Sequence, residues 1–482
     1  MNKPVILVID QGTSSTKAFL FDRNLNPLWN SKIRHAVVRK QSGWAECDAE
    51  KIWSVVLSLM NTASDICHSQ SLTITAMGTA FQRSTFLFWN KVSKRAITQA
   101  MSWQDNRAKE VTEEIVDKSD WIHQTTGTPL SPHFGGPKFL FSIRQNRELK
   151  KKVLNGEVYF GTLSTFITHR LTGQAVMDES IASRSLLFNL NDLTWDQDLL
   201  KLFEVPINCL PDIVHTCGDF GTVSIGTISV PLLCVIGDQQ ASLLGQNRWE
   251  AGETAINFGT SGSLLVNSGM SPVKISNLVS SILFSTDSEQ LYLLEGTINS
   301  VSVLFKWLEV FLGISHEEMN WGERCHRETD GILIPGMNGI SAPYWTGEFD
   351  TAFFDFPENC HPNEYVRAGM ESIGFLTHDI YNIIQQKTAI KVHDITASGG
   401  ASKPELLQFI SDLLGTSIWS SAGKDMTALG VARLVAEQVW DGIYRQGEIE
   451  RVKKFVPTMT ENKRQQKIQR WENALRQLNI IT

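Results

Sequence analysis

Two short segments of this chain place glycine and hydroxyl side chains directly after an apolar run. They occupy residues 7–14 and 255–262. Small residues let backbone N–H groups approach phosphate oxygens, and the hydroxyl groups add further donors. A single copy of this pattern is more typical of a hairpin turn. Its repetition predicts two loops that face each other and hold one nucleotide triphosphate from both sides. The predicted phosphate-binding residues of the two loops are Gly12, Thr13, Ser14, Gly259 and Thr260.

Two charged residues accompany the first segment. Asp10 stands where a strand would deliver it to the mouth of the loop. A carboxylate beside phosphate-binding amides indicates a Mg²⁺ ion, held directly or through water, because its charge would otherwise repel phosphate. Lys17 is either a point charge for the triphosphate or an exposed strand lysine. The sequence alone leaves both roles open.

A third carboxylate, Asp238, lies between the apolar run 230–236 and a helix-like run at 240–244. Phosphoryl transfer to an alcohol needs a group that accepts the hydroxyl proton, and Asp238 is our candidate for this general base. It can also cap the following helix, and the two roles are compatible.

A turn of small residues at 396–405 opens the apolar helix predicted at 406–414. Such a turn either lets a flat ring or a phosphate lie against the backbone, or is only a tight connection between a strand and a helix. If the first interpretation holds, the contacts come from Gly399, Gly400 and Ala401.

The elements that must position these residues alternate between strands and helices, which favours an α/β fold. We predict strands at 5–9, 18–21, 73–78 and 85–89, and a helix at 49–60. We expect one domain at 1–246, a second at 247–440, and a helical tail at 441–482 packed on the second domain. The strands and helices predicted for the second domain are 254–258, 263–267, 291–294, 301–311 and 365–388.

Length, charge and cysteine content narrow the function. With 482 residues, the chain is long enough for two or three domains with a cleft between them. A net charge of -7 gives no general attraction for nucleic acid or an anionic membrane. Seven scattered cysteines argue against a disulfide framework and favour the cytoplasm. No apolar stretch approaches a membrane span.

Taken with several further motifs in the same order, these segments resemble the FGGY carbohydrate kinases over nearly the whole chain. The resemblance implies two actin-like ATPase (ribonuclease H-like) domains. It also implies ATP-dependent transfer of a γ-phosphoryl group to a hydroxyl of a small polyol or sugar, with Mg²⁺. The matching segments are 10–14, 82–85, 103–107, 237–239, 259–262, 342–345, 367–373, 399–402 and 427–430.

Within the family, the chain is most similar to the glycerol kinase branch. The resemblance assigns Asp238 as the base, the two loops as phosphate sites, and Gly400 to the nucleoside pocket. The substrate-binding residues that it implies are Arg83, Ser84, Trp103, Asp105, His133, Asp238 and Gln239.

Several positions depart from that branch. Ser84 stands where glycerol kinases have a glutamate, which removes a charge and predicts a larger pocket. His133 replaces a tyrosine and can titrate. Ser302, which we assign to the ATP site, and Lys306 replace a glycine and a glutamine, and the turn at 399–402 is one residue shorter, as in the family's pentulose kinases.

These departures leave two alternatives to a glycerol kinase-like enzyme. One is a pentulose kinase for substrates such as xylulose or ribulose, and the other is a non-catalytic nucleotide-binding protein on the same scaffold. Members of the family often form homodimers, but no residue of this chain marks an interface.

Overall fold

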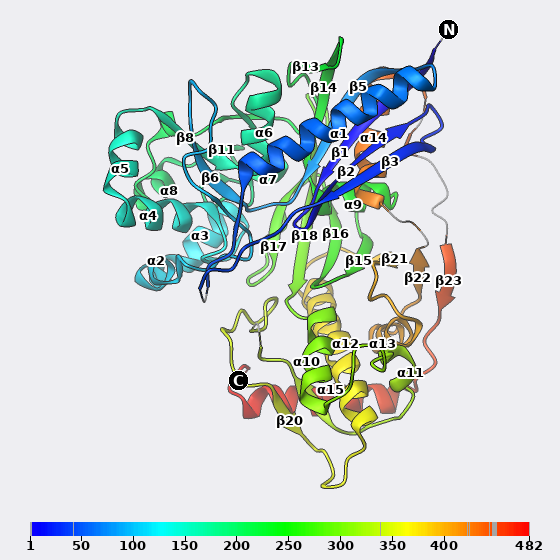
Figure 1. The fold of residues 1–482 in the computed structure, drawn as a ribbon. Coiled ribbons are helices and arrows are strands. Elements are labelled where there is room, and N and C mark those ends of the chain that lie inside the picture. The colour runs from blue at the N-terminus through cyan, green and yellow to red at the C-terminus, as the bar shows by residue number, and fades with distance from the viewer. Residues whose placement is uncertain are drawn as a thin grey trace.

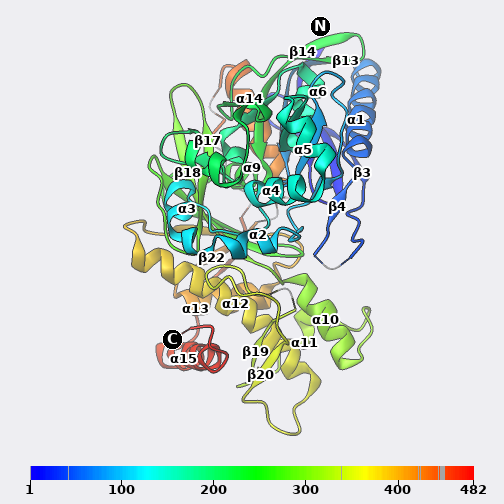
Figure 2. The ribbon, with the colours of Figure 1, turned by 90° about the vertical axis from the view of Figure 1, so that its left-hand side faces the viewer.

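The computed structural model describes residues 2–41, 43–337, 339–421, 423, 425–442, 444–445 and 451–481. Two large mixed β-sheets, each flanked by helices, form its two lobes (Figures 1 and 2). The first lobe holds the N-terminus and an added α/β layer, and the second lobe holds the C-terminal helix.

The first sheet has six strands in the order β13-β14-β5-β1-β2-β3. β1 and β2 form an antiparallel hairpin, whereas β1, β5 and β14 run parallel to one another. The strands are β1 (Lys3–Gln11), β2 (Ser15–Phe21), β3 (Pro27–Arg34), β5 (Leu72–Phe81), β13 (Thr222–Ile225) and β14 (Ile228–Gly237).

The second sheet repeats this arrangement, with the order β17-β18-β16-β15-β21-β22-β23. β15 and β16 form the antiparallel hairpin, and β15, β21 and β22 are parallel, so β15 corresponds to β1. The strands are β15 (Glu253–Phe258), β16 (Gly262–Gly269), β17 (Val279–Ser285), β18 (Gln290–Ile298), β21 (His393–Ser398), β22 (Ile418–Ser421) and β23 (Arg451–Phe455).

The apolar run of β1 is buried on both faces. Val5, Leu7 and Ile9 join a core with helix α1 (Ala49–Ser69), whereas Ile6 and Val8 join another with helix α14 (Met426–Val439). Successive side chains of a strand point to opposite faces, so a continuous apolar run suits a strand covered on both sides. The two helices cover opposite faces of the first sheet (Figure 1).

Helix α9 (Asp238–Gly245) and α14 lie between the two sheets. Their shared core includes Ala255, Leu265 and Leu293 from the second sheet beside Ile6 and Val8 from the first. Helix α14 therefore packs on the first sheet although in sequence it lies between β22 and β23 of the second.

The added layer of the first lobe is built on a four-stranded sheet in the order β4-β7-β6-β8. Its strands are β4 (Glu46–Cys47), β6 (Phe86–Asn90), β7 (Ala100–Met101) and β8 (Val158–Thr162). Its helices are α2 (Lys109–Glu114), η1 (Val116–Lys118), α3 (Ser119–Thr126), α4 (Gly135–Gln145), α5 (Arg147–Leu154) and α6 (Leu163–Thr172).

Short elements then lead from this layer back to β13. They are β9 (Val176–Asp178), α7 (Glu179–Ala182), β10 (Phe188–Asn189), β11 (Thr194–Trp195), α8 (Gln197–Leu202), η2 (Ile207–Cys209) and β12 (Asp212–Val214).

The remaining elements cover the outer face of the second sheet, where a separate core collects Ile256, Leu264 and Leu294. They are α10 (Ser302–Leu312), α11 (Trp321–Arg324), β19 (Ile332–Ile334), β20 (Ala352–Phe354), α12 (Pro362–Lys387), α13 (Pro404–Leu414) and α15 (Glu461–Gln477). The apolar stripe of α15 is docked there, and the Trp471 ring stacks on Phe375 with centroids 5.0 Å apart.

The two-domain α/β fold is confirmed. The structure differs from several predicted elements. For example, α1 extends to Ser69, α12 begins at Pro362, and the chain after 440 contributes the strand β23 as well as a helix. Within the described residues, no helix combines the length and the apolar character needed to cross a bilayer.

Candidate active site

Both predicted phosphate loops are the turns of equivalent hairpins. In the β1–β2 turn, the Gly12 amide donates to the Ser15 carbonyl at 3.0 Å, and in the β15–β16 turn the Gly259 amide donates to the Ser261 carbonyl at 2.9 Å. Thr260 is exposed. The duplicated fold therefore explains why the sequence pattern occurs twice, and phosphate binding by these loops stays a prediction.

Asp10 lies near the end of β1 and is only 8% exposed. Burial raises the pKa of its carboxyl to about 6, the charge of Lys17 opposes this rise, and the charges of Asp238 and Asp425 add to it. Lys17 Nζ lies 3.7 Å from Asp10 Oδ2 and donates to Asp425 Oδ1 at 2.6 Å. Lys17 is thus paired with carboxylates rather than an isolated exposed lysine.

This arrangement fits a divalent cation bound together with a nucleotide. Asp10 interacts with the single positive charge of Lys17 and with the negative charges of two further carboxylates, Asp238 and Asp425. The described residues contain no group of three or more His, Cys, Asp or Glu side chains able to hold a metal ion. A cation at Asp10 would therefore take its remaining ligands from phosphate oxygens and water, as Mg²⁺ commonly does.

Asp238 begins α9 at the end of the parallel strand β14, and 24% of its side chain is exposed. Its Oδ1 accepts from the Gln239 amide at 2.8 Å and lies 3.6 Å from Arg83 Nε. Burial raises the pKa of Asp238, and the positive charge of Arg83 opposes the rise. Gln239 Oε1 in turn accepts from the Ser263 hydroxyl of β16 at 3.3 Å.

Sequence reasoning missed two charged residues beside this pair. Glu295, on β18, accepts two hydrogen bonds from Arg83. Arg184 lies 3.3 Å from Glu295 Oε2, and burial lowers its pKa to about 10. The available signal for Glu295 was a single acidic residue within an apolar strand.

Ser84 has a left-handed backbone (φ 57°) and is 4% exposed. Its hydroxyl donates to the Arg184 carbonyl at 3.3 Å. The buried Lys138 Nζ donates to the carbonyls of Ser84 and Ser102 at 3.0 and 2.7 Å, and to that of Met101 at 3.4 Å. One lysine therefore fixes two stretches of backbone, at Ser84 and just before Trp103.

Trp103 links the predicted substrate residues to the first loop, because its indole Nε1 donates to the Thr13 hydroxyl at 2.9 Å. Asp105 interacts with the charges of His133 and Lys138, but its own carboxylate is already occupied. Its carboxylate is 0% exposed and accepts from the Ala45 amide at 2.7 Å and from Arg107 Nη2 at 2.6 Å. Contact of Asp105 with a substrate stays a prediction, whereas its structural pairing is observed.

His133 does not titrate near neutral pH as its residue type suggested. Burial and the neighbouring Lys138 lower its pKa to about 4. Its ring is therefore neutral under ordinary conditions and offers one donor and one acceptor.

The second loop is held by the start of α10. The Ser302 hydroxyl and amide donate to the Gly259 carbonyl at 2.7 and 3.2 Å. The predicted nucleoside turn lies next to the same strand, because the Ala401 amide donates to the Phe258 carbonyl at 3.0 Å. Lys306, one turn further along α10, is exposed.

Gly399 adopts φ +100°, and a Cβ on it would lie 2.2 Å from the Phe258 carbonyl oxygen. A Cβ on Gly400 would meet no atom within 4 Å. The turn thus presents open backbone beside the second loop, which suits the predicted contact with a nucleotide.

Comparison with known proteins identifies the family. The model of the N-terminal domain of the FGGY family of carbohydrate kinases matches residues 5–245, and that of the C-terminal domain matches residues 254–438. The chain belongs to the FGGY family of carbohydrate kinases. This FGGY kinase is therefore a phosphotransferase that acts on an alcohol group, which does not support the non-catalytic alternative.

Its relatives include a glycerol kinase of Ligilactobacillus salivarius, 31% identical over 100% of this chain and 98% of that protein. The crystal structure of Plasmodium falciparum glycerol kinase with ADP has a TM-score of 0.90 at 29% identity, covering 98% of both chains. A ligand-bound xylulose kinase from Lactobacillus acidophilus has a TM-score of 0.84 at 22% identity, covering 98% of both chains, and shares the fold.

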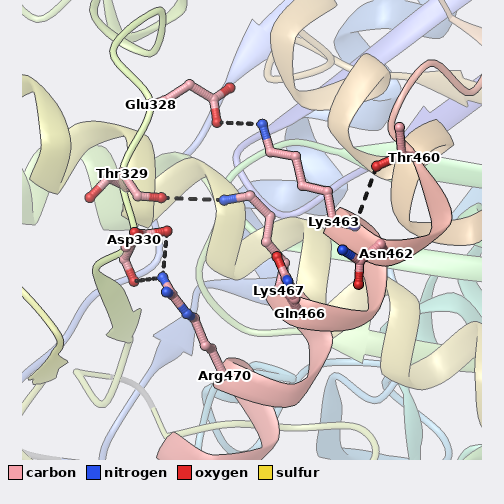
Figure 3. Close-up of a pocket in the computed structure, with 9 residues that line it drawn as sticks. All are labelled: Glu328, Thr329, Asp330, Thr460, Asn462, Lys463, Gln466, Lys467 and Arg470. Carbon is pink, nitrogen blue, oxygen red and sulfur yellow. Dashed lines mark hydrogen bonds and ion pairs between the residues drawn. The ribbon is translucent and has the colours of Figure 1, made fainter.

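A hollow of about 470 Å³ lies away from these residues, between α15 and the segment before β19 (Figure 3). The cations that line it already have oxygen partners. Lys463 pairs with Glu328 at 3.1 Å, Lys467 donates to the Thr329 carbonyl, and Arg470 pairs with Asp330. This hollow therefore offers no unpaired cation among the residues that line it, and the group around Asp238 stays the candidate active site.

Proposed function

We propose that this FGGY kinase transfers the γ-phosphoryl group of ATP to a hydroxyl of a small polyol, with Asp238 as the general base. The observation that carries the proposal is the position of Asp238. It lies at the end of a parallel strand, partly exposed, 3.6 Å from Arg83 and close enough to Asp10 to raise the pKa of that carboxyl.

The chemistry follows from these surroundings. The raised pKa makes Asp238 a stronger base than a solvated aspartate, which favours removal of the proton from the attacking hydroxyl. Arg83 and Gln239 would orient that hydroxyl, with Ser84, Trp103 and His133 around the rest of the acceptor. Closure of the two lobes would exclude water and so suppress hydrolysis of ATP.

The nucleotide would lie across the second loop and the turn at Gly399, Gly400 and Ala401. Its phosphates would meet the amides of both loops, with Ser302 supporting Gly259. Asp10 would hold Mg²⁺, which offsets the charge of the phosphates when bound. Lys17 is positioned to add a further positive charge beside Asp10.

Glycerol is the first acceptor to test, because the relative that is 31% identical over the whole chain is named a glycerol kinase. A pentulose is the second candidate, favoured by Ser84. Its short hydroxyl is already bonded to the Arg184 carbonyl and cannot reach as far as a glutamate.

The test measures ATP consumption together with mass spectrometry of the products. Glycerol, tetritols, pentitols, ribulose and xylulose are offered separately with Mg²⁺. Phosphorylated glycerol supports the first candidate, and a phosphorylated pentulose alone supports the second. No product from any acceptor would contradict the proposal.

The role of Asp238 is tested with Asp238→Asn. We expect turnover to fall by on the order of a hundredfold to ten-thousandfold, because a general base is removed, while ATP binding is retained. Asp212→Asn, an exposed change on β12, is the control. Unchanged turnover in Asp238→Asn would contradict the assignment.

A further inference from the structure

We propose that Glu295, a residue of the second lobe, is a positioning residue for the acceptor pocket: it fixes the Arg83 guanidinium and keeps Asp238 available as the base. This inference rests on the proposed function of Arg83 and Asp238. It adds a residue that completes the acceptor pocket from the opposite lobe.

The geometry of the Glu295–Arg83 pair is bidentate. Arg83 Nη1 donates to Glu295 Oε2 at 2.7 Å, and Nη2 donates to Oε1 at 2.9 Å. Two parallel hydrogen bonds between a planar guanidinium and a carboxylate fix orientation as well as distance. Arg83 Nη1 also donates to Gln240 Oε1 at 3.2 Å, so Nε is the group left facing Asp238.

The charges around this pair balance only when Glu295 is ionised. Its pKa is lowered to about 2, because the attraction of Arg184 and Arg83 outweighs the effect of burial. The charged groups that act on Asp238 are the cations Arg83 and Arg184 and the anion Glu295, and the charge of Asp10 also interacts with it. Without Glu295, two buried cations would face Asp238.

Two consequences follow for Asp238. Arg83 would lose its preferred carboxylate and turn toward Asp238, which is already 3.6 Å from its Nε. The pKa of Asp238 would then fall, because a cation is drawn closer and the anion Glu295, which raises it, is gone. The base would be weaker and the guanidinium would no longer be held for the acceptor.

Glu295 reaches this pocket from the sheet that carries the second phosphate loop. It lies on β18 opposite Leu265 of β16, and β16 begins at Gly262, directly after that loop. Arg83 follows β5 of the first sheet. The acceptor pocket is therefore complete only while the two lobes hold this arrangement.

The test uses Glu295→Gln, which keeps the size of the side chain and removes its charge. We expect the KM of the acceptor to rise about ten- to a hundredfold, because charge-assisted hydrogen bonds that hold Arg83 are lost. We expect the acidic limb of the kcat against pH profile to move by about one pH unit toward acid. The dissociation constant of a non-hydrolysable ATP analogue should stay unchanged.

Two further variants separate this role from a general loss of structure. Glu295→Asp keeps the charge but shortens the side chain, so its KM should rise while its pH profile stays close to wild type. Glu289→Gln is the matched control. It removes another arginine-paired carboxylate, whose two oxygens accept from Arg445 Nη1 at 2.7 and 2.8 Å and which lies outside the pocket. We expect wild-type kinetics from it.

The outcomes are distinguishable. A wild-type protein that phosphorylates no acceptor contradicts the proposed function itself. If the wild type is active but Glu295→Gln has the same acceptor KM and the same pH profile as the wild type, the role of Glu295 alone is overturned. An equal loss of affinity for the acceptor and for the ATP analogue in Glu295→Gln overturns it as well. If Glu295→Gln does not fold, an unchanged acceptor KM in Glu295→Asp overturns it.

Discussion

Replacing Asp10 by asparagine should stabilise the protein while it abolishes Mg²⁺-dependent turnover. The carboxylate is 8% exposed and interacts with the charges of Asp238 and Asp425. Keeping it ionised at neutral pH therefore costs free energy that the folded chain must supply. Asp10→Asn removes this cost, and Lys17 keeps its closer partner Asp425 at 2.6 Å.

The size of the effect follows from the pKa. The value for Asp10 rises from 3.8 to about 6 on folding. A raised pKa means that the folded state binds the proton more tightly than the unfolded state does. Proton binding to Asp10 therefore stabilises the fold, and this stabilisation is complete below pH 3.8 and is lost as the pH rises through about 6. At pH 7 the cost is about 3 kcal/mol, and at pH 5 it is about half of that.

The measurement compares thermal unfolding of wild type and Asp10→Asn at pH 7.5 and pH 5. We expect the variant to unfold at a higher temperature at pH 7.5, with a smaller gain at pH 5. Asp350→Asn, at an exposed residue, is the control and should change neither value. In parallel, Mg²⁺ should no longer strengthen the binding of ATP to Asp10→Asn.

Two results would refute this reasoning. The first is an Asp10→Asn variant less stable than wild type at pH 7.5, which would mean that the carboxylate stabilises the fold. The second is an equal gain at both pH values, which would mean that the gain does not come from ionisation.

Two further predictions concern backbone supports. Lys138→Met removes three hydrogen bonds to main-chain carbonyls and should raise the acceptor KM about tenfold or more, with little change in the KM of ATP. Steady-state kinetics check this, and a parallel rise of both constants would contradict it. Gly399→Ala should weaken ATP binding and cost about 1–3 kcal/mol of stability. The backbone at this position has φ +100°, which alanine rarely adopts, and the added Cβ would lie 2.2 Å from the Phe258 carbonyl oxygen. Thermal unfolding checks the loss of stability against Gly400→Ala, which has open space, and calorimetry compares ATP binding with that of the wild type.

The parts of the fold that the sequence predicted are those with a local signal. Continuous apolar runs such as β1 and β14 indicate strands buried on both faces, and the structure places them in that setting. β23 was missed because four of its five residues are exposed and three are basic. This composition is typical of a charged edge strand, and it lacks the apolar run from which the other strands were predicted.

The residues of the candidate site likewise divide into those with a local sequence signal and those without one. Gly12, Gly259 and Asp238 carry their signal in the residues next to them, since each follows an apolar strand. Glu295 contacts Arg83 across 212 residues of sequence, and no spacing rule connects two such positions. His133 likewise required the structure, because its pKa is lowered mainly by burial, which the sequence does not show, and further by the charge of Lys138.

The position of Asp238 depends on contacts between the lobes as well as on its own strand. Helix α9 starts at Asp238 and ends at Gly245, where a Cβ would lie 1.9 Å from the Met426 carbonyl oxygen of α14. On the facing helix, a Cβ on Gly430 would lie 1.9 Å from the Ala241 carbonyl oxygen. Only glycine at both positions allows the two helix backbones to approach this closely. Both α14 and Glu295 belong to the second half of the chain. That half therefore supports the helix that carries Asp238, through α14, and holds Arg83, through Glu295 on β18.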